Sequence, residues 1–169
     1  ERRNAWLSYT EAEEKELEQV AKAYRNFLNV GKTERECVTQ IIREARAAGY
    51  ESLEEKTAKG EKLKAGDKVY TVGMKKIIAL FHIGQDDISE GMNILGAHID
   101  SPRLDVKQNP LYEDTDLAYL DTHYYGGVKK YQWVTLPLAM HGVVAKKDGS
   151  IVEISIGEDA EDPVLYITD

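Results

Sequence analysis

The sequence predicts an α/β protein in which N-terminal helices pack on a mixed sheet and a β-rich segment follows. Three observations predict this class: two capped amphipathic helices open the chain, apolar strands follow them, and a hairpin pattern lies near the end. The chain has 169 residues, of which 42% are hydrophobic and 31% are charged. This composition is typical of a globular domain and argues against disorder throughout.

The first helix is predicted over residues 11–29. Thr10 precedes it and Glu13 stands three residues later, which is the spacing of a capping box. Apolar residues then recur at helical spacing and predict one apolar face. They are Leu17, Val20, Ala21, Tyr24 and Leu28.

The second helix is predicted over residues 34–48. Thr33 and Glu36 repeat the capping-box spacing, and Gly49 is well placed to end the helix. Its predicted buried stripe contains Val38, Ile41, Ile42 and Ala45. The charged stretch 59–68 contains two glycines and predicts a loop.

Strand-like patterns replace the helical period after this loop. Residues 68–72 and 77–83 predict two strands around a turn, and the second is apolar enough to expect cover on both faces. The apolar run 92–99 predicts a central strand. Residues 119–125 predict another strand, because aromatic and β-branched residues are frequent there.

The last predicted unit is a β-hairpin. Residues 140–147 and 150–156 are extended, and Asp148 with Gly149 is expected to supply the positive-φ residues of a two-residue turn. The intervening stretch 101–116 carries two prolines and mixed charge, so we expect it to be irregular.

Charge and cysteine content exclude several functions. The net charge of −8 argues against nucleic acid as a partner, because nucleic-acid-binding proteins usually carry a basic face. The one cysteine, Cys37, excludes a disulfide within the chain and predicts a reducing compartment, so we expect a cytoplasmic location. No apolar run approaches the ~18 residues of a membrane span, so no membrane partner is expected.

The residues that indicate chemistry lie in the run Gly96–Pro102, at the end of the predicted central strand. Sites in open α/β sheets form beyond the carboxyl ends of strands. His98 and Asp100 are two residues apart and would project to the same side of a strand. A carboxylate there can orient the imidazole and leave its other nitrogen for a metal.

A His-x-Asp pair occurs often by chance, and a hydrogen-bonded structural histidine is its more frequent meaning. The position of His98 at a strand end strengthens the case for a metal role, although the structural role is still the more frequent one. Neutral imidazole suits zinc. However, a catalytic zinc needs about three protein ligands. The sequence has no His-Glu-x-x-His, Cys-x-x-Cys or Walker loop to supply them.

Other polar and aromatic residues are predicted to have structural roles. Arg103 is expected to pair with Asp105 or a neighbour rather than with a substrate. Structural roles are expected for His82 and His141. His123 could line the rim of an active site, but a surface or interface role is expected. The aromatic residues Tyr119, Tyr124, Tyr125 and Trp133 are candidates for oligomer contacts.

Several of these motifs together resemble one known family. The run His98–Lys107 is similar to the first signature of the aspartyl aminopeptidase / aminopeptidase I family, and Tyr124–Gly127, Trp133, Leu136–Leu138 and Gly142–Val144 follow in that family's order. Its members are tetrahedral, dodecameric di-zinc exopeptidases. The resemblance extends over nearly the whole chain and implies the N-terminal portion of such a protein.

The resemblance implies roles for two residues. His98 would ligate one of two zinc ions, and Asp100 would have a catalytic role by orienting His98. The family's other ligands are a bridging Asp, a Glu-Glu pair whose first member is the general base, another Asp and a final His, all further downstream. Residues 1–135 would form the first segment of the catalytic α/β domain, and 136–169 the start of an inserted β-rich dimerisation domain.

The implied function is hydrolysis of the N-terminal residue of peptides with a free amino terminus, by a zinc metalloaminopeptidase in a homo-oligomer. The 169-residue segment alone would be inactive. Two alternatives stay open: a non-catalytic scaffold or oligomerisation fragment of the same fold, and a related zinc amidohydrolase. The sequence does not determine the preferred N-terminal residue.

Overall fold

A computed structural model describes residues 4–167. The predicted domains also include residues 1–3 and 168–169, which lie outside that range. Contacts within the chain divide it into two compact units, one ending at Ile99 and one beginning at Asp100. A search of the described residues finds no helix with the length and hydrophobicity needed to cross a bilayer.

Two long helices open the first unit and its longer strands follow, as the sequence predicts. The elements are η1 (Ala5–Leu7), α1 (Glu11–Val30), α2 (Glu34–Ala47), β1 (Glu51–Ser52), α3 (Leu53–Ala58), β2 (Lys68–Gly73), β3 (Ile77–His82) and η2 (Ile88–Glu90). Both predicted capping boxes are present at the starts of α1 and α2. Each uses the side chains of Thr and Glu to satisfy backbone donors that a helix start leaves without a partner.

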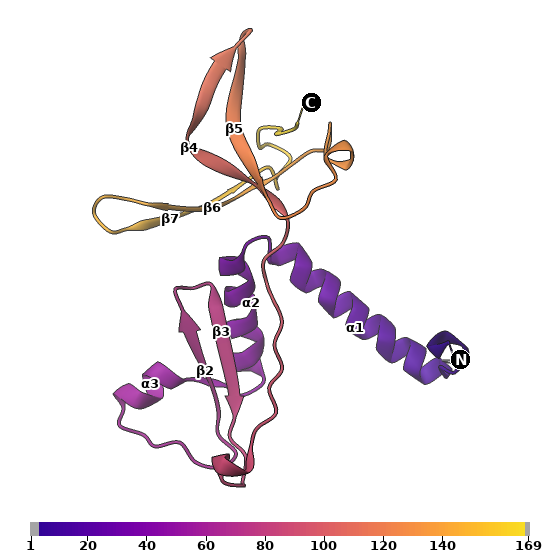
Figure 1. Ribbon diagram of the computed structural model, residues 1–169, viewed down its shortest axis with the longest axis vertical. Coiled ribbons are helices and arrows are strands. Elements are labelled where there is room, and N and C mark those ends of the chain that lie inside the picture. The colour runs from indigo at the N-terminus through magenta and orange to yellow at the C-terminus, as the bar shows by residue number, and fades with distance from the viewer. Residues whose placement is uncertain (1–3, 168–169) are drawn as a thin grey trace. The chain divides into compact units, whose positions relative to one another are not determined.

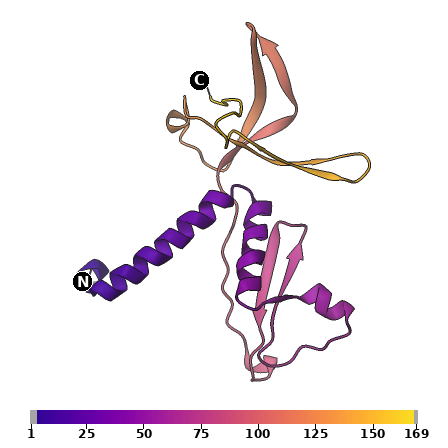
Figure 2. The ribbon, with the colours of Figure 1, turned by 180° about the vertical axis from the view of Figure 1, so that it is seen from behind.

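The sheet of the first unit is mixed, which confirms the predicted fold class. β2 lies in the middle, parallel to β1 and antiparallel to β3. Helix α2 lies along β2 and β3 in both ribbon views (Figure 1 and Figure 2). The buried apolar residues come from α2 and β2, and they are Cys37, Val38, Ala45, Val69 and Tyr70.

Helix α1 has the predicted apolar face but does not bury it against other described residues. Its apolar face is formed but not covered by the described chain, since Val20 is 65% exposed and Tyr24 is 61% exposed. No residue of α1 is buried within the described range. The helix is therefore held by its own hydrogen bonds and by its junction with α2.

Two strand predictions for the first unit are wrong. β3 is not covered on both faces, because Ile77 is 69% exposed and Phe81 is 45% exposed. Residues 92–99 form no strand but an extended trace that pairs with no strand of the described chain (Figure 2). Apolar composition favours a buried strand, but a strand also needs a hydrogen-bonding neighbour.

The second unit is built from antiparallel ribbons. Its elements are β4 (Arg103–Asp114), β5 (Leu117–Tyr125), η3 (Lys130–Gln132), β6 (Met140–Ala145) and β7 (Ile151–Ile156). β4 pairs with β5, and β6 pairs with β7. The predicted strand near Tyr119–Tyr125 is confirmed as β5, and the predicted hairpin as β6–β7.

The prediction of irregular structure over residues 101–116 is wrong. β4 runs through most of this stretch, and its register with β5 shifts between Val106 and Leu111. The bulge takes up Pro110, which cannot donate a ladder hydrogen bond. Beyond the bulge, the rings of Tyr112 and Tyr119 stack with centroids 5.3 Å apart.

The turn of the β6–β7 hairpin also differs from the two-residue prediction. Among the turn residues only Gly149 has a positive φ, of 85°. Its N–H donates to the Lys146 carbonyl at 3.0 Å, and the Lys146 N–H donates to the Ser150 carbonyl at 2.8 Å. This is a three-residue loop that closes on a left-handed glycine, which is the next most common hairpin geometry.

Candidate metal centre

The candidate metal ligand His98 lies in the extended segment 92–99, one residue before the end of the first unit. Its side chain is exposed. The end of the segment approaches helix α2, because the Sγ of Cys37 lies 3.8 Å from the Ile99 carbonyl oxygen. An exposed imidazole is accessible to a metal, whereas one packed in hydrocarbon would not be.

Asp100 begins the second unit and is half-buried. Its Oδ2 accepts a hydrogen bond from the hydroxyl of Tyr125 at 2.9 Å. Tyr125 is the last residue of β5, so a residue 25 positions away in the chain fixes this carboxylate. The sequence did not predict this contact, because it depends on the pairing of β4 with β5.

Arg103 holds the ring of Tyr125 from one face. The register of the ribbon sets Arg103 directly opposite Tyr125, and the guanidinium carbon lies 4.2 Å from the ring centroid. At that distance a cation is attracted to the face of the ring. The Nε of Arg103 donates to Asp105 at 2.7 Å, which confirms the predicted Arg103–Asp105 pair.

The backbone on each side of this contact is also constrained. Gly126 follows Tyr125 with a φ of 72°, which favours glycine. A Cβ added there would lie 3.5 Å from the Cα of Pro102. Pro102 therefore lies beside Gly126 with room for a Cβ in ordinary van der Waals contact, so the left-handed φ and not crowding favours glycine there.

Cys37 does not offer a second metal ligand. It is buried beneath Gly31, with its Sγ 3.5 Å from the Gly31 carbonyl oxygen. Burial, and then the nearby carboxylates of Glu36 and Glu34, raise the pKa of the thiol. A raised pKa disfavours the thiolate that binds metals, so Cys37 acts as a small packing residue.

The other histidines lie on strands. His82 ends β3 and His123 lies on β5, and both are exposed. His141 lies on β6, where its Nε2 is 2.9 Å from Glu158. That contact ties the hairpin to the acidic segment after it and agrees with a structural role.

The described residues do not assemble a complete metal site. Over residues 4–167 there is no group of three or more His, Cys, Asp or Glu side chains that could hold an ion. Since a zinc ion in a catalytic site takes about three protein ligands, His98 fits one position and the set requires further donors.

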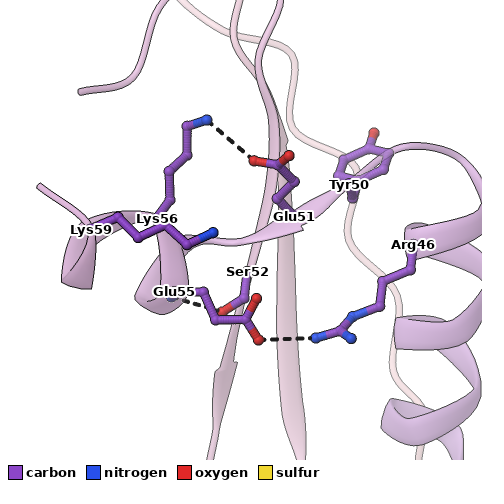
Figure 3. Close-up of a pocket in the computed structure, with 7 residues that line it drawn as sticks. All are labelled: Arg46, Tyr50, Glu51, Ser52, Glu55, Lys56 and Lys59. Carbon is purple, nitrogen blue, oxygen red and sulfur yellow. Dashed lines mark hydrogen bonds and ion pairs between the residues drawn. The ribbon is translucent and has the colours of Figure 1, made fainter. Parts of the chain in front are cut away.

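A polar pocket of about 240 Å³ lies elsewhere in the first unit, between α2, β1 and α3 (Figure 3). Two ion pairs lie in its wall: Arg46 with Glu55 at 3.2 Å and Lys56 with Glu51 at 3.2 Å. It contains neither His98 nor Asp100. The two ion pairs join α3 to α2 and to β1. The pocket is separate from the candidate metal centre.

Solved aminopeptidase structures share this fold. The chain matches aminopeptidase I from Borrelia burgdorferi B31 with a TM-score of 0.90 and 40% identity, over 99% of this chain and 40% of that one. It matches aminopeptidase I from Clostridium acetobutylicum with a TM-score of 0.84 and 57% identity, over 100% of this chain and 37% of that one. The fold is that of the aminopeptidase I class.

A family model described as aminopeptidase I zinc metalloprotease (M18) matches residues 27–169. A curated relative, a probable M18 family aminopeptidase 1 from Clostridium acetobutylicum, is 57% identical over all 169 residues. Its counterpart from Thermotoga maritima is 44% identical over 173 aligned positions. The chain belongs to the M18 family of zinc metalloproteases, which confirms the resemblance seen in the sequence.

The match covers only part of each relative. This chain spans 36% of the length of both curated relatives, although all of its own residues align with them.

Proposed function

We propose that the whole protein is a zinc metalloaminopeptidase that removes N-terminal residues from peptides, and that this chain supplies its first metal ligand, His98. The observation that carries the proposal is the family match over residues 27–169, which includes His98 and Asp100. The exposed position of His98 supports it.

His98 would hold one of two zinc ions. Neutral imidazole is a common zinc ligand. The other donors would be carboxylates and a histidine from elsewhere in the whole protein, because the described residues bring no ligand group together. The segment alone would then be inactive, which is the expectation from its sequence.

Asp100 would orient His98. A carboxylate that accepts the N–H of a ligating imidazole fixes the tautomer of that ring and the direction of its other nitrogen. The hydrogen bond from Tyr125 supports this role, since it restricts the rotation of the Asp100 carboxylate. Asp100 would thus act on the reaction through His98 rather than by proton transfer to the substrate.

Zinc, when bound, would polarise the scissile carbonyl and lower the pKa of a bound water. This chain would contribute ligand geometry through His98 and Asp100. The general base would come from the Glu-Glu pair that the family resemblance implies. The substrate would be a peptide with a free amino terminus.

The assembly would be a homo-oligomer in the cytoplasm, a dodecamer by family resemblance. Residues 1–135 would belong to the catalytic domain and residues 136–169 to the start of an inserted dimerisation domain. The β6–β7 ribbon supports the second part, since an exposed two-stranded ribbon gains stability by pairing with another element.

Zinc content of the whole protein tests the proposal. The His98→Ala variant should lose about one equivalent of zinc, because a site with three protein ligands depends on each of them. Its peptidase activity should fall to background. His82→Ala is the matched control, since His82 is also exposed but lies on β3 outside the candidate site.

Unchanged zinc content in His98→Ala would remove the central assignment. Activity on blocked amino termini, with none on free ones, would instead indicate a related zinc amidohydrolase. Lack of both zinc and activity in the unaltered whole protein would indicate a scaffold that keeps the fold.

A further inference from the structure

We propose that Tyr125 is a positioning residue for the metal centre, and that its hydroxyl fixes the Asp100 carboxylate in the orientation from which Asp100 directs His98. This inference rests on the proposed function. It adds Tyr125 to the residues of the candidate metal centre, and so gives the run Tyr125–Gly127 a role there.

The first argument is the directness of the contact. The Tyr125 hydroxyl donates to Asp100 Oδ2 at 2.9 Å. A hydrogen bond to a charged acceptor is shorter and stronger than one between neutral groups. The Tyr125 hydroxyl thus holds Oδ2 of Asp100, and Oδ1 faces a different direction in which it can contact another group.

The second argument is that the Tyr125 ring is itself held on one face, by Arg103. Arg103 covers one face at 4.2 Å and is anchored by Asp105 at 2.7 Å. The pairing of Arg103 with Tyr125 comes from the ribbon register, so backbone hydrogen bonds set it. A side chain fixed by its neighbours loses little entropy when it makes a further hydrogen bond.

The third argument is the backbone turn after Tyr125. Gly126 has a φ of 72° and lies against Pro102, two residues after Asp100. The segments that carry Asp100 and Tyr125 therefore lie side by side where a proline and a left-handed glycine limit the backbone. Such a rigid frame suits a residue that must keep a carboxylate in one orientation.

The neighbouring Tyr124 provides a matched control. It is also a strand residue of β5, and its side chain points to the opposite face of the ribbon. Lys130 lies 5.3 Å from its ring centroid, but its hydroxyl has no hydrogen-bond partner among the described residues. Tyr124→Phe and Tyr125→Phe thus remove the same atom from two adjacent sites.

The experiment measures zinc affinity of the whole protein by competition with a chelator, together with kcat, KM and thermal unfolding of the zinc-free form. Partners of ligating groups typically contribute tenfold to a hundredfold to metal affinity, and Tyr125 acts one contact further away, so Tyr125→Phe should weaken zinc binding by about threefold to tenfold. The value of kcat should fall with KM unchanged. The unfolding temperature of the zinc-free form should stay the same, and Tyr124→Phe should match the unaltered protein in all four measurements.

A double variant tests whether Tyr125 works through Asp100. If it does, Asp100→Ala with Tyr125→Phe should bind zinc no more weakly than Asp100→Ala alone, because residues in one network are not additive. Full addition of the two effects would overturn the inference, as would zinc affinity in Tyr125→Phe equal to that of the unaltered protein. Weaker zinc binding in Asp100→Ala but not in Tyr125→Phe would refute this inference alone, whereas unchanged binding in His98→Ala would refute the proposed function with it.

Discussion

Arg46 donates a hydrogen bond from Nε to the hydroxyl of Tyr70 at 2.8 Å, and this contact joins the end of α2 to the middle of β2. Tyr70 is buried, and 4% of the residue's surface is exposed. The guanidinium carbon lies 5.8 Å from the ring centroid. Tyr70 thus makes both a hydrogen bond and a cation–π contact with Arg46 of the helix that covers its strand.

Tyr70→Phe should lower the free energy of unfolding of the first unit by about 1 kcal/mol, the usual net contribution of one intramolecular hydrogen bond. The ring stays, so packing and the contact with the Arg46 cation are kept. Urea unfolding of the whole protein measures the change. Tyr50→Phe is the control, since the Tyr50 hydroxyl has no hydrogen-bond partner in the described chain; an equal loss in both variants would contradict the expectation.

Thr33→Ala should destabilise the first unit by about 1 kcal/mol, because it removes a capping-box side chain. Thr33 accepts from the Glu36 N–H at 3.3 Å, and α2 supplies much of the buried core. Thr10→Ala breaks the same motif in α1, which buries no residue of the described chain. Its cost should appear as local fraying of α1 rather than in global unfolding.

Circular dichroism and urea unfolding together separate the two effects. Thr10→Ala should lose some helix signal without a change in the unfolding midpoint, and Thr33→Ala should shift the midpoint. An equal midpoint shift in the two variants would show that α1 is as firmly packed as α2.

These capping boxes also explain why the helices were predictable from sequence. Each box uses residues three positions apart, Thr10 with Glu13 and Thr33 with Glu36, so all the information lies in one turn of chain. The helix starts predicted from this spacing agree with the structure. Burial of α1 was not predictable in the same way, because it depends on what covers the helix.

Strand pairing was harder to predict because it depends on distant residues. Pro110 and a bulge interrupt the strand pattern of β4, so the sequence does not reveal it. The strand forms because Arg103 and Leu104 pair with Tyr125 and Tyr124 of β5. Residues 92–99 have the composition of a strand but no such partner in the described chain.

The sequence singled out His98 and Asp100 as site residues, and their roles stay predictions. It also predicted that Arg103 pairs with Asp105 or a neighbour, and the structure shows the pair with Asp105. The sequence did not predict that Tyr125 contacts Asp100. The Tyr-Gly-Gly run and the His-x-Asp run lie about 25 residues apart, and only the β4–β5 register brings the Tyr125 hydroxyl to the carboxylate.

Asp162 should make the segment after β7 sensitive to acid. Its Oδ2 accepts the N–H of Gly157 at 2.7 Å and that of Asp159 at 3.3 Å. These backbone hydrogen bonds, the Gly157 bond first, lower the pKa of Asp162. The stabilisation is therefore complete above the ordinary aspartate pKa of about 3.9, and it is lost as the pH falls through the lower pKa of the folded state.

Amide hydrogen exchange of Gly157 measures this effect by nuclear magnetic resonance. Protection of Gly157 should be constant from neutral pH to about pH 5 and should decrease below about pH 4, after correction for intrinsic exchange. Asp162→Asn should lower the protection at neutral pH and flatten this dependence, whereas Asp159→Asn should leave it unchanged. A Gly157 amide that stays protected in acid in the unaltered protein would contradict the assignment.

Gly157→Ala should destabilise the second unit more than Gly149→Ala, although both glycines have positive φ angles, of 98° and 85°. A Cβ at position 149 would meet nothing within 4 Å, so Gly149→Ala pays only for the left-handed backbone, about 1–2 kcal/mol. A Cβ at position 157 would lie 2.7 Å from the Leu138 carbonyl oxygen and 3.0 Å from the Ala139 Cα.

Both of those contacts are with backbone atoms, which cannot move aside as a flexible side chain can. Gly157→Ala must therefore separate the chain after β7 from the segment that leads into β6. We expect thermal unfolding to show a clearly larger loss of stability for Gly157→Ala than for Gly149→Ala. Equal losses of stability in the two variants would contradict this expectation. They would mean that the left-handed backbone alone requires glycine at position 157, and that the close approach of residues 138–139 does not.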